Sequence, residues 1–188
     1  MAILDLSKVL MYSFHYGYMK HRYVSKVRFM YTDIDSFIYE IKTDDFYSDM
    51  KDDINLYETS DCDKNNVYNL SLVNKKVIRK MKEENKGNIM TEYVGLKSKM
   101  YAYKRNNKIE KSLKGIKKQT LKNKITLGDY KVCLLNKILK YVDMNLIGSK
   151  FHSIHSIKQN KLALSYKDDK RFVNGNGITT LAHVDIGR

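Results

Sequence analysis

The chain of 188 residues contains no proline and only two cysteines. Cys62 and Cys133 lie far apart, and neither has a neighbour at the spacing of a zinc site or a disulfide framework. We expect both to be reduced thiols, which is typical of an intracellular protein. No apolar run reaches membrane-spanning length. Because Asp5 and Lys8 interrupt the apolar opening Met1–Leu4, we expect no signal peptide.

The composition that is present indicates a folded protein. Hydrophobic residues make up 43% of the chain and aromatic residues 11%, which favours a folded chain over a disordered one. At this length the chain can bury a real core, in one domain or in two small ones. Lysine, asparagine, tyrosine and isoleucine are abundant, and this bias, with the lack of proline, fits an AT-rich coding sequence better than a structural demand.

The net charge of +14 is spread unevenly along the chain. Between residues 33 and 63, eleven acidic residues stand against Lys42 and Lys51, a local net charge of −9. Between residues 97 and 124, eleven basic residues stand against Glu110 alone, a local net charge of +10. A solvated charged face is the ordinary interpretation of such runs. An acidic half followed by a basic half nevertheless suits a protein that holds metal at one place and phosphate backbone at another.

The N-terminal segment has helical periodicity. Residues 2–20 are predicted to form a helix, because Leu6, Leu10 and Phe14 recur at every fourth position. The apolar stripe is widened by Ile3, Val9 and Tyr18. His15 lies off this stripe, and we expect it at the surface or at an interface rather than as a metal ligand.

Two strand-like runs follow, at residues 26–30 and 38–41, and they enclose the stretch Tyr31-Thr32-Asp33-Ile34-Asp35-Ser36-Phe37. Side chains at i and i+2 of an extended chain point the same way. Asp33 and Asp35 are therefore predicted to project together from the tip of a hairpin. Two neighbouring carboxylates stay ionised cheaply only beside a cation, and oxygen ligands suit Mg²⁺. The alternative is a plain acidic turn, because aspartate is common in turns.

Further elements are expected downstream. Thr43-Asp44-Asp45 predicts the start of a short helix over residues 46–53. Residues 75–85 are ambiguous between strand and helix, whereas residues 87–114 indicate two or three strands. A second helix is predicted from Thr126, which forms a capping-box pattern with Asp129; its apolar face would comprise Leu127, Tyr130, Leu134 and Ile138. The remaining strands are predicted at residues 151–154, 162–164, 171–173 and 178–181, with a turn at Asn174-Gly175-Asn176-Gly177.

Several blocks of this sequence together resemble the family B DNA polymerases. Tyr31-Thr32-Asp33-Ile34-Asp35-Ser36 resembles their motif C, Tyr-x-Asp-Thr-Asp-Ser. Gly95-Leu96-Lys97-Ser98-Lys99-Met100-Tyr101 resembles the Lys-x-Tyr motif of the protein-primed branch. Leu113-Lys114-Gly115-Ile116-Lys117-Lys118 resembles the Lys-Gly-Val/Ile-Lys-Lys stretch that follows. Residues 2–8 and 178–183 are similar to segments of the polymerases of Polinton (Maverick) elements and their viral relatives, so the likeness covers essentially the whole chain.

This resemblance implies an α+β fragment with part of a polymerase palm over residues 1–95 and a thumb with C-terminal strands over residues 96–188. It also implies two-metal nucleotidyl transfer with Mg²⁺ as cofactor. Asp35 would be the direct metal ligand and a catalytic carboxylate, and Asp33 would support it. The implied compartment is intracellular, with the nucleus as one candidate.

The resemblance also implies primer–template DNA and deoxynucleoside triphosphates as partners once the missing motifs are supplied. From the sequence itself we expect no membrane association, and it gives no evidence for an oligomer. Lys99 and Tyr101 would hold the primer strand near its end. Lys114, Lys117 and Lys118 would contact the duplex backbone without reading its sequence. The alternatives are that Tyr101 fills a strand face and that the lysines guard an edge strand.

Two departures from the family pattern stand out. Ile34 replaces the usual threonine of motif C. The chain also has no proline and no Asn-Ser pair, so motif A (Asp with Ser-Leu-Tyr-Pro) and motif B (Lys-x-x-x-Asn-Ser-x-Tyr-Gly) are both missing. We therefore expect no DNA synthesis by this chain alone. The alternatives are a non-catalytic basic DNA-binding module derived from a mobile element and, less in keeping with the later blocks, an unrelated metal-dependent nuclease.

Overall fold

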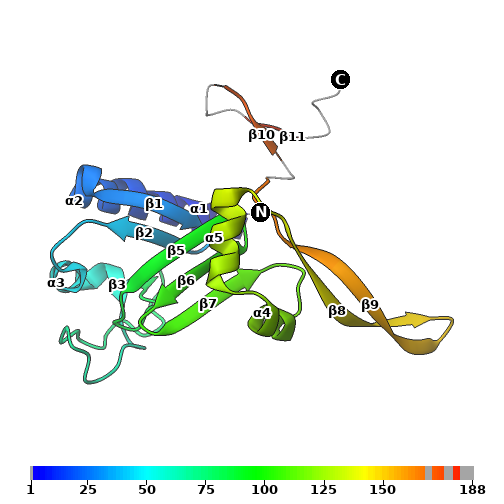
Figure 1. The fold of residues 1–188 in the computed structure, drawn as a ribbon. Helices are drawn as coiled ribbons and strands as arrows, with labels where there is room; N and C mark the ends of the chain where they lie inside the picture. Colours follow the sequence, from blue (N-terminus) through cyan, green and yellow to red (C-terminus); the bar gives the residue numbers. More distant parts are fainter. Residues whose placement is uncertain (1, 168–170, 176–179, 183–188) are drawn as a thin grey trace. The chain divides into compact units, whose positions relative to one another are not determined.

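The computed structural model describes residues 2–167, 171–175 and 180–182, and it combines helices with small sheets (Figure 1). The chain divides into two compact units. Unit 1 comprises Met1–Thr91 and Arg105–Asn107, and unit 2 comprises Glu92–Lys104 and Lys108–Arg188. The predicted α+β class is confirmed. The assignment of palm and thumb to residues 1–95 and 96–188 stays a prediction.

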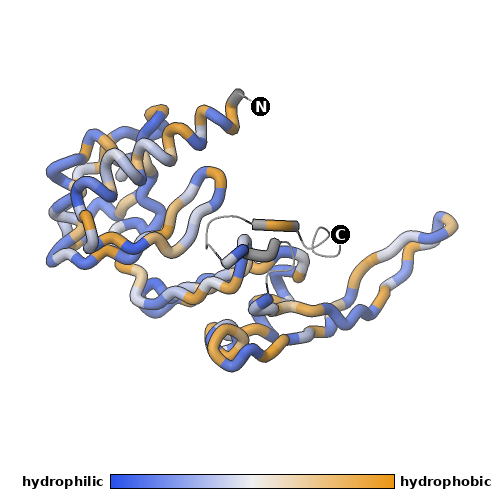
Figure 2. The backbone as a smooth tube through the Cα atoms, turned by 90° about the horizontal axis from the view of Figure 1, so that it is seen from above, coloured by the Kyte–Doolittle hydropathy of each residue, from blue (hydrophilic) through white to orange (hydrophobic). Residues whose placement is uncertain are grey.

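Unit 1 opens with a continuous helical segment, as predicted. It consists of α1 (Ala2–Tyr12), the π-helix η1 (Ser13–Met19) and α2 (Lys20–Tyr23). Hydrophobic positions recur along α1 (Figure 2), but Leu6 and Val9 are 69% and 62% exposed, whereas Met11 is buried. The predicted apolar stripe is therefore wrong over its first half, and the packed part of the helix begins only at Met11.

The predicted hairpin is confirmed. β1 (Val27–Thr32) pairs antiparallel with β2 (Phe37–Ile41), and Thr32 opposite Phe37 is the last pair before the tip. A register shift between Phe29 and Tyr31 marks a bulge in β1. An isolated two-stranded hairpin is marginally stable in water. Packing against the helical segment, through Met19, Tyr23 and Val27, therefore holds it in place.

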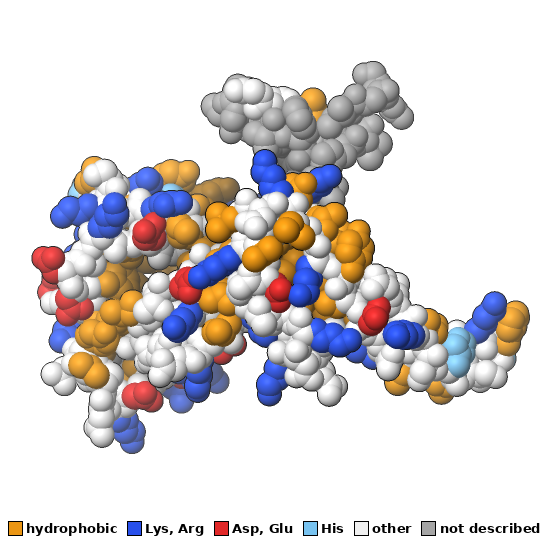
Figure 3. Space-filling model, viewed as in Figure 1, with side chains coloured by type: hydrophobic (Ala, Val, Ile, Leu, Met, Phe, Trp, Pro, Cys, Tyr) orange, Lys and Arg blue, Asp and Glu red, His pale blue; other side chains and the backbone are white. Residues whose placement is uncertain are grey.

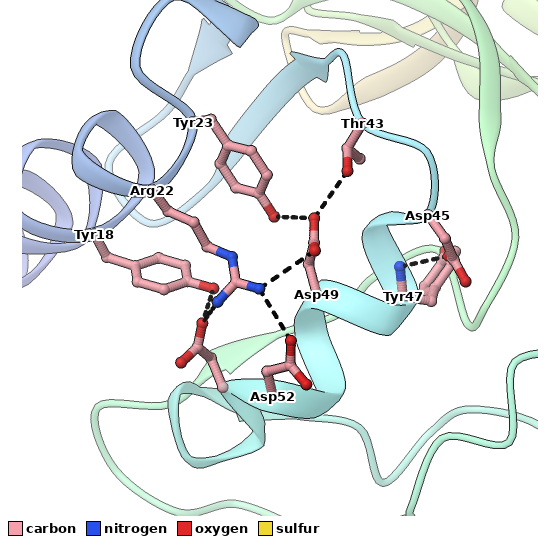
Figure 4. A network of polar contacts seen from close by, with 9 residues as sticks. Tyr18, Arg22, Tyr23, Thr43, Asp45, Tyr47, Asp49 and Asp52 are labelled. Atoms are coloured by element: carbon pink, nitrogen blue, oxygen red, sulfur yellow. Dashed lines mark hydrogen bonds and ion pairs between the residues drawn. The ribbon is translucent and has the colours of Figure 1, made fainter.

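The helix predicted after Thr43-Asp44-Asp45 is α3 (Phe46–Asp52), and Asp45 caps it by accepting a hydrogen bond from the Tyr47 amide at 2.9 Å. Arg22 of α2 ties this helix to the N-terminal segment (Figure 4). Its guanidinium lies 3.3 Å from a carboxylate oxygen of Asp49 and 3.3 Å from one of Asp52, and it also contacts Asp53. Three carboxylates of the acidic run are thus engaged by one arginine inside unit 1.

Asp49 is the centre of this network. Its carboxylate also accepts hydrogen bonds from the hydroxyl groups of Tyr23 and Thr43, each at 3.0 Å (Figure 4). Burial disfavours the ionised form of Asp49, but the hydrogen bonds from Thr43, Tyr23 and Arg22 outweigh it and hold the pKa of Asp49 below its ordinary value. This carboxylate therefore has a structural role in joining three segments of unit 1.

The rest of unit 1 contains little regular structure. The 3₁₀-helix η3 (Ile54–Leu56) leads into β3 (Tyr57–Glu58), which pairs in parallel with β4 (Met81–Lys82). The ambiguous stretch 75–85 therefore contains only a two-residue strand. Side chains hold the long connection in place: the Thr59 hydroxyl donates to the Ser71 carbonyl at 2.5 Å. Cys62 in unit 1 and Cys133 in unit 2 are buried free thiols, as predicted.

Unit 2 is built on a three-stranded sheet. The strands are β5 (Met90–Lys97, whose first two residues belong to unit 1), β6 (Met100–Arg105) and β7 (Lys108–Leu113), in that order. Two-residue turns join them, which confirms the strands predicted within residues 87–114. One face of the sheet packs on α5 (Leu127–Asn136) in a core that includes Val94, Ala102 and Tyr130.

The predicted start of α5 is confirmed, and its predicted apolar face is confirmed at Leu127 and Tyr130 and wrong at Leu134 and Ile138. Thr126 and Asp129 form a reciprocal capping box, with the Thr126 amide 2.7 Å from an Asp129 carboxylate oxygen. The buried face consists of Leu127, Tyr130 and Cys133. Leu134 is 44% exposed, and Ile138 lies beyond the helix because Lys137 adopts a left-handed backbone conformation.

The short helix α4 (Lys118–Lys124) and a long ribbon complete the core of unit 2. The ribbon pairs β8 (Lys140–Lys150) with β9 (Ser153–Leu164) and extends away from the sheet (Figure 1). Its base is buried at Val142, Met144, Ala163 and Leu164. The two short strands predicted at 151–154 and 162–164 are thus parts of one hairpin turn and one long strand.

The last described elements are β10 (Arg171–Val173) and β11 (Thr180–Ala182), which pair antiparallel. The strand predicted at 171–173 is confirmed. The strand predicted at 178–181 and the turn at 174–177 lie partly outside the described residues. Among the described helices, none has the length and apolar character needed to span a membrane.

Candidate metal-binding hairpin and nucleic-acid interface

Asp33 and Asp35 both lie at the tip of the β1–β2 hairpin, as predicted. Residues 33–36 form a four-residue turn, in which the Asp33 amide donates to the Ser36 carbonyl at 3.1 Å. A carboxylate oxygen of Asp33 accepts from the Ile34 amide at 2.9 Å. The backbone is therefore not extended at the tip, and the alternation argument for two parallel carboxylates does not apply there. Asp35 is exposed and Asp33 is half-buried.

The tip is also supported by α1. The Ser7 hydroxyl donates to the Ile34 carbonyl at 3.3 Å, and the Thr32 hydroxyl donates to the Asp33 carbonyl at 2.8 Å. The Ile34 side chain is 52% exposed, so this turn buries no side chain at position 34. These hydrogen bonds hold the tip through its backbone carbonyls and do not involve the Asp35 carboxylate.

The residues at the tip fit Mg²⁺ in kind but not in number. Carboxylate oxygens are the ligands that Mg²⁺ prefers, and an exposed carboxylate such as that of Asp35 can coordinate a Mg²⁺ ion. Across the described part of the chain, however, no three His, Cys, Asp or Glu side chains gather into a group that could hold a metal ion. A two-metal site needs carboxylates from more than this one turn, so no reaction step is derived through a metal here.

His15 was expected at the surface or at an interface, and the structure buries it between the helical segment and the hairpin of unit 1. It is 8% exposed, and its Nδ1 lies 2.9 Å from the Tyr39 hydroxyl. Its ring stacks on Tyr39 with centroids 5.7 Å apart, and the Phe29 ring lies 5.0 Å away. His15 lies in the π-helix four residues before Met19, and both side chains are buried.

The buried environment of His15 predicts a pH-dependent stability. Burial, and then the charge of Lys20, lowers the pKa of His15 below its ordinary value of 6.5. Because the unfolded chain then takes up the proton more readily than the folded one, stability is fully present above the unfolded pKa and declines as the pH falls below it. We expect the unfolding temperature to fall between about pH 7.5 and about pH 5.5.

Thermal unfolding followed by circular dichroism measures this dependence. His15→Phe should flatten it, whereas His21→Phe, at an exposed position of α2, should leave it unchanged. If the unfolding temperature depended on pH identically in the wild-type chain and in His15→Phe, protonation of His15 would not be coupled to the stability of the protein.

The residues predicted to contact DNA belong to unit 2 and lie at its turns. Lys99 occupies the β5–β6 turn with φ at 59°, and Tyr101 follows on β6. Lys114 and Lys117 are exposed on the connection between β7 and α4, and Lys118 is exposed as the first residue of α4. All three lysines therefore lie within one stretch of five residues.

The Leu113–Lys118 block has a clear local design. Gly115 adopts φ of +87°, a conformation that favours glycine, and Ile116 is buried in the core. The ammonium group of Lys161, on the β8–β9 ribbon, donates to the Gly115 carbonyl at 3.1 Å. The buried isoleucine fixes the turn while its neighbouring lysines remain exposed, and Lys161 adds another positive charge beside them.

Not every lysine of the basic run is available to a ligand. The Lys111 ammonium group donates to the carbonyls of Leu121 at 3.0 Å and Ile125 at 2.5 Å, at the C-terminal end of α4. Lys124 donates to the Asp143 carbonyl at 2.7 Å. These two lysines hold α4 and the β8–β9 ribbon in place, so the composition of the basic run overstates the number of lysines that a ligand could contact.

The net charge is carried almost entirely by unit 2. By sequence, unit 1 contains 15 Lys and Arg against 14 Asp and Glu, a net charge of +1, and unit 2 contains 20 against 7, a net charge of +13. Lysine and arginine side chains are visible over the region of α4, α5 and the β8–β9 ribbon (Figure 3). The acidic and basic halves noted in the sequence therefore correspond to a nearly neutral unit and a strongly basic one.

Sequence reasoning missed two tyrosines beside the predicted DNA contacts. Tyr93 on β5 and Tyr103 on β6 alternate with the buried residues Val94 and Ala102. They therefore share the sheet face of Tyr101, opposite the core. The alternation was visible in the sequence, but without the strand boundaries it did not separate a core face from an outer face.

Comparison with known proteins adds no relative: no family model, no curated protein and no solved structure matches this chain.

Proposed function

We propose that the chain is a palm-and-thumb fragment resembling a family B DNA polymerase, which binds primer–template DNA and does not synthesise DNA by itself. The observation that carries this proposal is the motif C-like block, whose two aspartates form the tip of a helix-supported hairpin. The proposal assigns metal binding to Asp35, with Asp33 in a supporting position.

The charge distribution supports the DNA-binding part of the proposal. Unit 2 has a net charge of +13, and its exposed Lys114, Lys117 and Lys118 lie within one stretch of five residues. Ammonium groups arranged in this way bind the phosphate backbone without reading bases. Lys99 and Tyr101 would contact the primer strand beside them.

The incomplete carboxylate set supports the inactive part of the proposal. Each metal of a two-metal site stabilises transition-state charge by several kcal/mol, and the described residues offer the tip aspartates without a third ligand group. We therefore expect the wild-type chain to extend a labelled primer no further than Asp35→Ala does, in Mg²⁺ with all four deoxynucleoside triphosphates. Extension by the wild-type chain that disappears in Asp35→Ala would contradict this expectation.

A non-catalytic DNA-binding module is the second candidate. It is favoured by the concentration of positive charge in unit 2, since the nearly neutral unit 1 that carries the hairpin would then contribute little to DNA binding. The two candidates differ in their dependence on the hairpin. A palm fragment should bind a primer–template junction more tightly when Mg²⁺ is present, and Asp35→Ala should remove that gain. A simple basic module should respond neither to Mg²⁺ in this way nor to the substitution.

A further inference from the structure

The outer face of the β5–β6–β7 sheet carries a row of aromatic rings. Val94, Met100 and Ala102 are buried against the α5 side of the sheet. Because successive side chains of a strand alternate between faces, Tyr93 and its neighbours on β6 point to the other side. The residues of this face are Tyr93, Tyr101 and Tyr103, each partly accessible; we call them the tyrosine face.

The rings of the tyrosine face are close enough to act as one surface. The ring centroids of Tyr93 and Tyr101 lie 6.1 Å apart, and those of Tyr101 and Tyr103 lie 6.3 Å apart. The planes of Tyr101 and Tyr103 differ by 19°, and those of Tyr93 and Tyr101 by 31°. The three rings therefore form a continuous aromatic surface along β5 and β6.

Gly95 determines the orientation of the first ring. A Cβ atom at Gly95 would lie 2.5 Å from the Tyr93 hydroxyl oxygen and 3.0 Å from two of its ring carbons. The Tyr93 ring therefore lies along its own strand, over the glycine. Any larger residue at position 95 would push the ring away from this position, so the glycine belongs to the tyrosine face as much as the rings do.

The charge around the tyrosine face selects the class of ligand. Lys97 ends β5 on the same face as Tyr93, Lys99 lies in the adjoining turn, and the unit as a whole has a net charge of +13. Aromatic rings interleaved with lysines are the usual arrangement for binding a single strand, since bases stack on the rings while cations contact the phosphates.

We propose that the tyrosine face stacks unpaired bases of single-stranded DNA, with Tyr93 and Tyr103 as binding residues beside Tyr101. The choice of DNA rests on the proposed function, and the stacking itself rests on the ring geometry. The face then gives the chain a preference for the unpaired strand at a primer–template junction, whereas the exposed lysines of residues 114–118 bind any duplex.

Fluorescence anisotropy with labelled oligo(dT) of about 12 nucleotides and with a blunt duplex of similar length tests this proposal. Replacing Tyr93 and Tyr103 together by leucine should weaken oligo(dT) binding about tenfold or more and duplex binding less than about twofold. Replacing both by phenylalanine should preserve binding, because the rings remain. Gly95→Ala should produce an intermediate loss for oligo(dT). Tyr141→Leu, at a 55% exposed position of β8, is the matched control and should change neither.

The outcomes separate the two proposals. The proposal for the tyrosine face would be overturned if the leucine pair weakened binding of oligo(dT) and of duplex equally, or weakened binding no more than Tyr141→Leu does. In either case, salt-sensitive duplex binding by the wild-type chain would leave the proposed function standing. Failure of the wild-type chain to bind either DNA would overturn both. The unfolding temperatures of the leucine and phenylalanine pairs show whether both variants are folded. If the two variants unfold at similar temperatures, a loss of binding in the leucine pair alone arises from the missing rings.

Discussion

Replacing Tyr130 with alanine is expected to lower the free energy of unfolding of unit 2 by about 3–5 kcal/mol. Tyr130 is fully buried at the centre of the core, and its hydroxyl donates to the Ser112 carbonyl at 2.9 Å. The substitution removes the ring, leaves a cavity and deprives that carbonyl of its donor. Because small domains are stable by only about 5–15 kcal/mol, this loss is a large share of the total.

Urea unfolding followed by circular dichroism measures the effect. Tyr130→Phe retains the ring and loses only the hydrogen bond, so we expect it to cost about 1 kcal/mol. Tyr141→Ala, at an exposed position, should cost less than about 0.5 kcal/mol. Equal losses for Tyr130→Ala and Tyr141→Ala would contradict the assignment of Tyr130 to the centre of the core.

Removing the three exposed lysines is expected to have the largest effect on DNA binding. The triple variant Lys114→Ala, Lys117→Ala and Lys118→Ala should lower affinity for duplex DNA about 100-fold near 0.1 M salt. The reason is that each phosphate no longer contacted by a lysine keeps its condensed counterions, and the free energy of their release is lost. The stability of unit 2 should change little, since all three side chains are exposed.

A control with the same change in net charge separates local contact from general attraction. Lys51, Lys64 and Lys75 are exposed residues of unit 1, and their replacement by alanine removes the same three charges. We expect this variant to bind duplex DNA within about threefold of the wild-type chain. Equal losses in the two triple variants would mean that net charge alone drives binding, with no interface at residues 114–118.

The elements that the sequence predicts correctly are those with strong local signals. The capping box of Thr126 and Asp129 and the N-cap of Asp45 both involve hydrogen bonds within a few residues, so the pattern and the structure coincide. The β1–β2 hairpin is equally local, because its strands are separated by only four residues. In each case no distant contact is needed to decide the conformation.

The elements that the sequence does not predict depend on distant contacts. Strand β8 contains Asp143, Asn145 and Gly148, which lack strand propensity, and it is ordered by pairing with β9. His15 is buried against Tyr39, which lies 24 residues further along the chain. The partners of Arg22 lie about 30 residues further along the chain, so no local pattern could assign them.

For the candidate site, the motif located the tip and did not predict its geometry. Asp33 and Asp35 lie at the hairpin tip that the two strand-like runs predicted, but the four-residue turn removes the extended alternation on which their pairing was argued. The DNA contacts at Lys114, Lys117 and Lys118 stay a prediction from the sequence, whereas Tyr93, Tyr103 and Gly95 became relevant only once the core face of the sheet was known.

The most direct test of DNA binding by unit 2 is the dissociation constant for primed duplex DNA measured as a function of salt, from about 50 mM to about 200 mM. We predict that the affinity of the wild-type chain falls steeply over this range. The slope of log affinity against log salt should be smaller by about 2.7 in the variant lacking Lys114, Lys117 and Lys118. An affinity independent of salt, or equal slopes for the two proteins, would contradict the account.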